Sequence, residues 1–107
     1  MLYYRVTGLT PKKVDAIQPA IVEALRAIGA SVVLLHAVGK GCPDLLVGYK
    51  NRNVLLEIKS LHGSHTPQQR FWHSQWKGQV YTVNSIDRAL EIVWLTSLTD
   101  TLKMVGK

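Results

Sequence analysis

The chain has 107 residues, enough for one domain with a substantial hydrophobic core and too few for two. Hydrophobic residues make up 47% of it, which excludes intrinsic disorder, and a single cysteine excludes an internal disulfide framework. Thirteen Lys and Arg residues against seven Asp and Glu residues give a net charge of +6. That charge favours a polyanionic partner such as nucleic acid, although a basic, inert surface would give the same balance.

No apolar run approaches the ~18 residues of a membrane span, and residues 1–5 lack the apolar core of a signal peptide. We therefore expect a cytoplasmic protein with no membrane partner. Cys42 has no His or Cys at zinc-ligand spacing and is interpreted as a small packed residue.

In chain order, Leu2–Val6 is compatible with an edge strand, followed by a turn or helix entrance. From Val14 apolar residues recur every three or four positions, which predicts an amphipathic helix ending near Gly29. Pro19 favours a start of the regular helix after Val14. The β-branched, apolar segment Ser31–Val38 then predicts a strand.

A β-hairpin is predicted next. Leu45–Val47 and Val54–Leu56 are short apolar runs, and the polar residues between them have the character of a turn centred near Lys50 and Asn51. This register places Asp44 opposite Glu57 on neighbouring antiparallel strands.

Three charged side chains converge on this hairpin. Because side chains alternate along a strand, Glu57 and Lys59 point to one face and Ile58 to the other. Two acids and one amine among leucines are costly to bury unless they pair or bind an ion. A divalent cation would use both Asp44 and Glu57.

The second helix has a clear start. Thr66 suits the N-cap, Pro67 the first helical position, and Gln69 the third position of a capping box, while Gly78 is expected to end the helix. The histidine-containing loop before it has too few ligands for zinc. Most of the core surface of this helix is expected to come from its aromatic residues, Phe71, Trp72 and Trp76.

The last elements are a strand at Val80–Val83 and a helix capped at Asn84-Ser85 that runs through Trp94. The segment Ile92–Val105 has more apolar residues than so small a domain needs. This surplus favours a homodimer interface, and the alternative is that it covers the domain's own sheet.

Pro43-Asp44 followed by Glu57-Ile58-Lys59 resembles the motif of the PD-(D/E)XK nuclease superfamily. Around it, Gly41–Tyr49 and Leu55–Lys59 are similar to the VRR-NUC branch, the virus-type replication-repair nucleases. Further motifs complete the resemblance over roughly residues 15–90: Thr66-Pro67-Gln68-Gln69, Trp72-His73 and Trp76-Lys77-Gly78.

The resemblance implies an α/β fold with a restriction-endonuclease-like core. We expect a mixed sheet of about four strands flanked by helices, in the order α-β-β-β-α-β-α. The chain would be a single domain over residues 1–107, with its core at about 14–94 and a C-terminal segment that dimerises. The implied activity is Mg²⁺- or Mn²⁺-dependent, structure-selective DNA endonuclease cleavage of branched DNA such as Holliday junctions.

The resemblance also assigns roles. Asp44, Glu57 and the backbone carbonyl of Ile58 would hold the metal, and Lys59 would orient the attacking water and stabilise the transition state. For Gln69 two roles stay open: capping its own helix, or positioning water or phosphate at the active site.

A helical acid usually completes the metal site in this superfamily, and in this chain its position falls on Gln18. Gln18 lies at the edge of the apolar stripe, whereas Glu23 points to solvent. Gln18 could act as a ligand directly or through water, or be a surface residue. The amide gives weight to an alternative, a catalytically inactive DNA-binding module on the same scaffold; a structural oligomerisation domain is a third possibility.

Basic residues flank these motifs and are candidates for DNA contacts. Lys40 lies in a flexible glycine-containing loop, where it would meet a phosphate or remain solvated. Arg70, His73 and Lys77 supply a basic rim on the second helix that could follow a DNA backbone.

Overall fold

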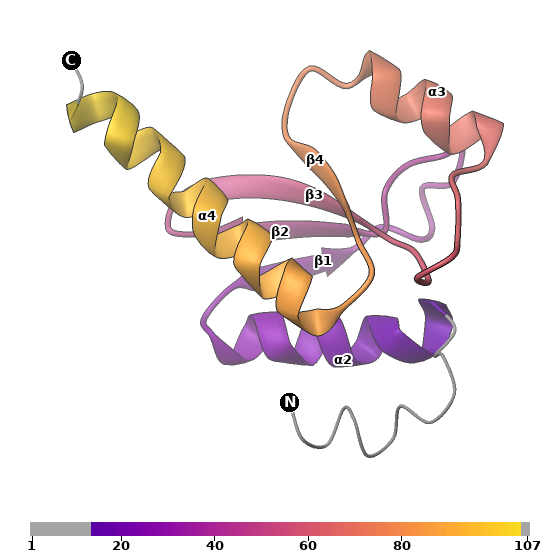
Figure 1. Ribbon diagram of the computed structural model, residues 1–107, viewed down its shortest axis with the longest axis horizontal. Helices are drawn as coiled ribbons and strands as arrows, with labels where there is room; N and C mark the ends of the chain where they lie inside the picture. Colours follow the sequence, from indigo (N-terminus) through magenta and orange to yellow (C-terminus); the bar gives the residue numbers. More distant parts are fainter. Residues whose placement is uncertain (1–13, 106–107) are drawn as a thin grey trace.

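The computed structural model describes residues 14–105 as three helices and a four-stranded sheet (Figure 1). The predicted order of elements, α-β-β-β-α-β-α, is confirmed. The edge strand expected at Leu2–Val6 lies outside the described residues. The elements are α2 (Val14–Ala27), β1 (Ser31–Leu34), β2 (Leu45–Tyr49), β3 (Arg52–Ile58), α3 (Pro67–Gln75), β4 (Val80–Val83) and α4 (Ile86–Val105).

The sheet is mixed, with strand order β1-β2-β3-β4. The first two pairings are antiparallel and the third is parallel, because α3 lies in the connection that returns the chain to the same direction. The predicted hairpin is confirmed: a two-residue turn joins β2 to β3, with positive φ angles of 52° at Lys50 and 64° at Asn51. Positive φ at both central residues is typical of the tight turns that match strand twist.

Strand β1 is shorter than predicted. It ends at Leu34, and the chain then turns, with a hydrogen bond of 2.9 Å from the Val38 amide to the Leu35 carbonyl. The expectation of a strand to Val38 was wrong because the largely apolar run continues through Leu35 and Val38, past the point where the chain must turn back toward β2.

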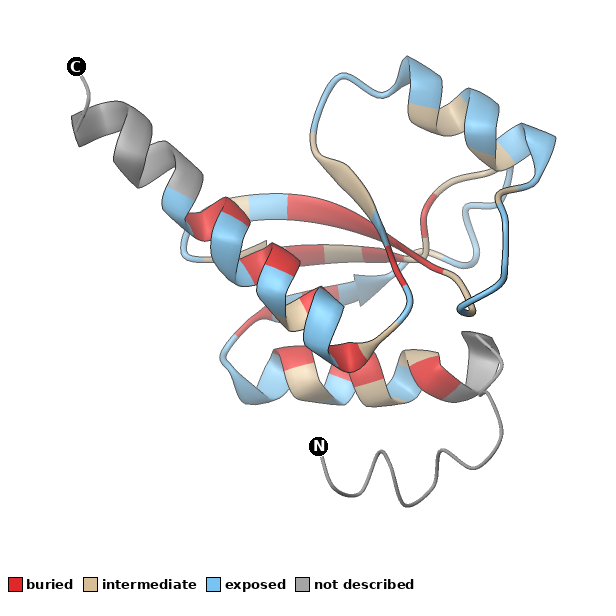
Figure 2. Cartoon of the chain, viewed as in Figure 1, coloured by how far each residue is buried: buried red, intermediate tan, exposed pale blue. Residues whose placement is uncertain are grey.

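Helices α2 and α4 pack against each other and cover the same face of the sheet (Figures 1 and 2). The core lies between them and the strands. Alternate residues of the strands supply its floor: Val32, Leu45, Val47, Val54, Leu56, Ile58 and Val83. Their neighbours along each strand therefore face the other way, and in the described residues no helix packs broadly over that second face.

The predicted apolar stripe of α2 is confirmed, since Ile17, Ile21 and Leu25 are buried. The helix begins at Val14, earlier than Pro19 led us to expect. Pro19 is exposed inside the helix, where the backbone carbonyl that loses its partner can bind water.

Helix α4 is one continuous element from Ile86 to Val105. The predicted cap is confirmed by a hydrogen bond of 3.0 Å from the Arg88 amide to Ser85 Oγ. Ile92 and Val93 enter the core, whereas an apolar stripe formed by Trp94, Leu95 and Leu98 is exposed. Within residues 14–105, no helix combines the length and apolar character that a bilayer crossing requires.

Helix α3 has no buried residue at all. Phe71 is 68% exposed and Trp76 is 46% exposed, so the expectation that the aromatic residues of this helix are mostly core was wrong. Trp72 stacks on Trp76, with ring centroids 4.8 Å apart and an interplanar angle of 19°. The helix ends at Gln75, before Gly78, and lies beyond the end of the sheet (Figure 1).

Candidate functional site

The regular ladder between β2 and β3 ends at the pair Leu45 and Leu56, and Asp44 lies one residue beyond it. The Asp44 amide donates to the Leu56 carbonyl at 3.0 Å. The Ile58 amide donates to Asp44 Oδ2 at 2.7 Å. The aspartate side chain thus replaces a backbone acceptor where the strands part, which fixes its carboxylate beside Glu57.

Glu57 is the charged residue most deeply buried among those described, with only 2% of its surface exposed. Burial raises the pKa of Glu57 from its usual 4.5 to about 8; a hydrogen bond with Asp44 and repulsion from its charge add to the rise, and Lys59 opposes it. With this raised pKa, Glu57 carries a proton at neutral pH unless a cation stabilises its ionised form. The predicted convergence of Asp44 and Glu57 is therefore present.

Gln69 links α3 to this acid pair. The Gln69 side-chain oxygen Oε1 accepts from the Thr66 backbone amide at 2.9 Å, and the Gln69 backbone amide donates to Thr66 Oγ1 at 3.1 Å. These two bonds confirm the predicted capping box. Gln69 Nε2 donates to Glu57 Oε2 at 3.2 Å. The two roles left open by the sequence are thus compatible: the cap fixes the amide orientation, so that the nitrogen points to the acid.

His73 approaches Glu57 more closely than its predicted place on an exposed DNA-binding rim implied. Its Nε2 lies 3.8 Å from Glu57 Oε1, and both atoms are buried without a hydrogen-bond partner. Burial lowers the pKa of His73 below its usual 6.5, and His65 and Lys59 act in the same direction. A neutral imidazole therefore faces the acid.

His65 supports His73 from the other side. The two rings have centroids 4.7 Å apart, and His65 Nε2 lies 2.8 Å from Thr82 Oγ1. The sequence placed His65 only in a loop and missed these contacts. The spacing of Gln69 and His73, one helical turn apart, was the available signal that both side chains share a face.

The glycine loop before Asp44 explains how α3 reaches the site. Gly41 has a φ of +84°, and a Cβ atom there would lie 2.5 Å from the Gln68 carbonyl oxygen. The absence of a side chain lets this loop lie directly against the first turn of α3. Gln69 follows Gln68 and is thereby held over Glu57.

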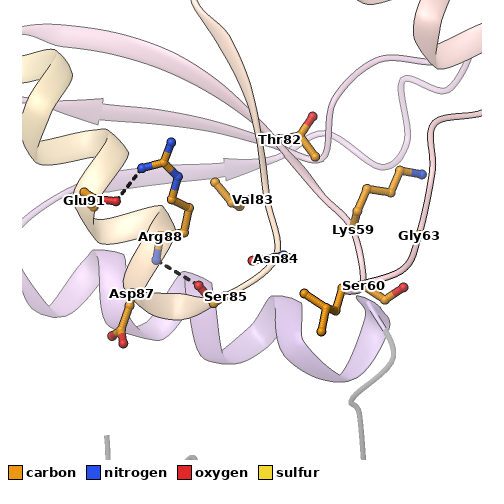
Figure 3. A pocket seen from close by; sticks show the side chains of 11 residues that line it. Lys59, Ser60, Gly63, Thr82, Val83, Asn84, Ser85, Asp87, Arg88 and Glu91 are labelled. Atoms are coloured by element: carbon orange, nitrogen blue, oxygen red, sulfur yellow. Dashed lines mark hydrogen bonds and ion pairs between the residues drawn. The ribbon is translucent and has the colours of Figure 1, made fainter.

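Lys59 lies at one end of a polar groove of about 620 Å³ between the loop after β3 and the start of α4. Figure 3 shows its amine directed away from Arg88 and toward the segment that leads to α3. Arg88 is paired with Glu91 within the groove. Lys59 is half-buried, and its positive charge favours the ionised form of Glu57 without outweighing the effect of burial.

The acid pair has the donor chemistry for a hard divalent cation. Glu57 Oε1 is buried and lacks a hydrogen-bond partner, and both groups offer carboxylate oxygens. The Ile58 amide donates to Asp44. In a strand, the carbonyl of a residue points to the same side as its amide, so the Ile58 carbonyl, the predicted backbone ligand, points to the side of Asp44. Within residues 14–105 no cluster of three or more His, Cys, Asp or Glu side chains is arranged for a metal. Mg²⁺ tolerates one or two carboxylates because it retains several waters.

Gln18 lies in a different groove, of about 540 Å³, beside Glu23 and Leu34 and along α2. It is half-buried there, on the helix-covered side of the sheet, and its role as a metal ligand stays a prediction. Of the predicted DNA contacts, Lys40, Arg70 and Lys77 are exposed, and Arg70 donates to the His65 carbonyl at 2.8 Å.

Comparisons of the chain with protein-family models, with curated proteins and with solved structures find no match.

Proposed function

We propose that this protein is a metal-dependent endodeoxyribonuclease with a PD-(D/E)XK-type core, as its resemblance to the VRR-NUC family implies. The observation that carries the proposal is the meeting of Asp44 and Glu57, with Lys59 beside them, where β2 and β3 part. A fold selected only for stability has little reason to bury Glu57 beside a second, half-buried carboxyl group, that of Asp44.

Asp44, Glu57 and the Ile58 carbonyl would hold Mg²⁺ or Mn²⁺. When bound, such an ion neutralises charge on the scissile phosphate and acidifies a water. The Ile58 amide fixes the Asp44 carboxylate, and Gln69 fixes that of Glu57. Lys59 supplies a positive charge for the developing phosphorane and orients the attacking water.

Substrate recognition is proposed to depend on shape and phosphates. The net charge of +6 and the exposed Lys40, Arg70 and Lys77 suit a DNA backbone. Branched DNA, including Holliday junctions, is the substrate class that the resemblance implies.

The proposal includes a homodimer formed through α4. Trp94, Leu95 and Leu98 are 52%, 45% and 36% exposed and lie along one stripe of the helix. A symmetric pair would bury this stripe and present two active sites to a two-strand substrate. Light scattering of wild type and Trp94→Glu tests it: we expect a dimer that the variant converts to a monomer, and a monomeric wild type would contradict it.

A catalytically inactive DNA-binding module is the second candidate. It is favoured by Gln18 at the position of the helical acid and by the presence of only two acidic ligands at the site within the described residues. Such a module would bind DNA through the same basic surface without hydrolysing it.

Cleavage assays on linear, flap and four-way DNA with Mg²⁺, Mn²⁺ or EDTA separate the two candidates. We expect cation-dependent cleavage that falls by about 10³-fold or more in Asp44→Asn and Glu57→Gln, since metal stabilisation contributes several kcal/mol. Lys59→Met should lose about 10²- to 10³-fold. DNA binding without cleavage by the wild type on every substrate would favour the inactive module.

A further inference from the structure

The face of the sheet that α2 and α4 leave uncovered carries an apolar groove of about 330 Å³. Leu46 and Leu55, paired across β2 and β3, form its floor. Trp76, just past the end of α3, forms a wall. The remaining lining residues are Asn53, Val54, Gly78 and Gln79.

This groove adjoins the acid pair. Leu46 on β2 is two residues after Asp44, which directly precedes that strand, and Leu55 is two residues before Glu57 on β3. All four side chains therefore point to the same face. Two residues of a strand span about 7 Å. The groove therefore lies beside the place where the proposed function puts the scissile phosphate.

The chemistry of the groove suits a flat, partly polar ring. The Trp76 indole stacks on Trp72 yet remains 46% exposed, which leaves aromatic surface for a further ring. Asn53 and Gln79 lie at the groove, where Gln79 Nε2 donates to the Asn53 backbone carbonyl at 3.4 Å. The Asn53 side-chain amide and the Gln79 side-chain oxygen can bond the edge of a base. Lys77, next to Trp76, is exposed and supplies positive charge for the attached backbone.

We propose that this groove binds one unpaired nucleobase of the substrate, adjacent to the scissile phosphate. The inference rests on the proposed function and narrows its substrate class to DNA with single-stranded nucleotides at the cleavage point. A base within a duplex cannot enter, because its faces are covered by stacking and its edge by pairing. A second copy of the chain is a poorer occupant, since a stable interface buries about 800 Å² on each partner, far more than this groove offers.

Binding of fluorescently labelled DNA in EDTA tests the inference without requiring cleavage. We expect Trp76→Ala to bind a single-stranded oligothymidine roughly 5- to 150-fold more weakly than wild type, the range for loss of one stacking contact. Trp76→Phe should recover much of that loss. Binding of a blunt duplex should be unchanged in both variants.

Phe71→Ala is the matched control, because Phe71 is an aromatic residue of α3 that is 68% exposed and does not line the groove. It should bind both DNAs as wild type does. Unchanged single-strand binding in Trp76→Ala, or equal losses for single-stranded and duplex DNA, would overturn the inference.

An abasic scan keeps the test independent of protein folding. With wild-type protein and Mg²⁺, we expect removal of the base beside the cleaved phosphate to slow cleavage of a flap by at least fivefold, while more distant abasic sites have no effect. An equal response at every position would overturn the base subsite and leave the nuclease proposal standing. If no DNA is cleaved but Trp76 still governs single-strand binding, the nuclease proposal falls and the groove remains a base-binding site.

Discussion

The two faces of the sheet are built on different principles. The face under α2 and α4 is held by side chains such as Leu45 and Leu56, which are fully buried. The opposite face holds Asp44 and Glu57, and α3 reaches it through the polar contacts of Gln69 and the approach of His73. Stability thus comes from one face, which leaves the other free to bury charges that a core would exclude.

The largest effect on stability should come from the covered face. Leu56→Ala removes a fully buried side chain and should lower the free energy of unfolding by about 2–5 kcal/mol in urea denaturation. Leu46→Ala, one strand away on the open face and only half-buried, should cost much less. Equal losses would show that the two faces do not differ as we describe.

The acid pair should make stability depend on pH. The pKa of Glu57 is raised to about 8 in the folded state. Protonated Glu57 therefore contributes to the free energy of unfolding in full below its ordinary pKa of 4.5, and this contribution is lost as the pH rises to about 8. Across that pH range we expect the free energy of unfolding of the metal-free wild type to fall by a few kcal/mol relative to that of Glu57→Gln, since each pKa unit corresponds to about 1.4 kcal/mol.

Chemical denaturation of both proteins at several pH values in EDTA provides the measurement. The comparison with Glu57→Gln is needed because His73, with its lowered pKa, loses its stabilising contribution as pH falls and so opposes the trend. Parallel pH curves for the two proteins would mean that Glu57 is not perturbed in the folded state.

A single added methyl group at Gly41 should disrupt the contact between the loop before Asp44 and α3. Gly41→Ala places a methyl group 2.5 Å from the Gln68 carbonyl oxygen at a φ of +84°, and should cost about 1–3 kcal/mol and displace α3. Gly39→Ala is the control: its φ is +70°, but nothing lies within 4 Å of the added methyl. It should cost about 1 kcal/mol and leave cleavage intact, so equal cleavage defects would contradict the role of this contact.

The smallest effects on stability are expected for Thr66→Ala and Gln69→Ala, and their cleavage rates should distinguish the two roles of Gln69. Thr66→Ala removes the capping oxygen and should cost about 1 kcal/mol. Gln69→Ala should cost a similar amount in thermal unfolding but also frees Glu57 Oε2, so its cleavage rate should fall well below that of Thr66→Ala. Equal rates would indicate that Gln69 acts only as a cap.

Local chemistry made the hairpin, the capping box and the strand at Val80–Val83 predictable, because turn residues, caps and β-branched runs act over a few positions. It also brought Asp44 and Glu57 together, since a two-residue turn fixes the register of the whole hairpin.

Long-range placement was not predictable in the same way. The aromatic residues of α3 have the composition of a core helix, yet Phe71 and Trp76 are exposed because the connection from β3 carries α3 beyond the end of the sheet. The approach of His73 to Glu57 depends on how α3 rests against Gly41, which periodicity does not encode.

Mn²⁺ binding to the metal-free protein, followed by electron paramagnetic resonance at pH 8, tests most directly whether Asp44 and Glu57 together hold a cation. We expect saturable binding by wild type, at least tenfold weaker binding by Asp44→Asn and by Glu57→Gln, and no change in Glu23→Gln, which alters an exposed acid on α2. Absence of binding by the wild type, or equal affinities in all four proteins, would contradict the proposed metal site.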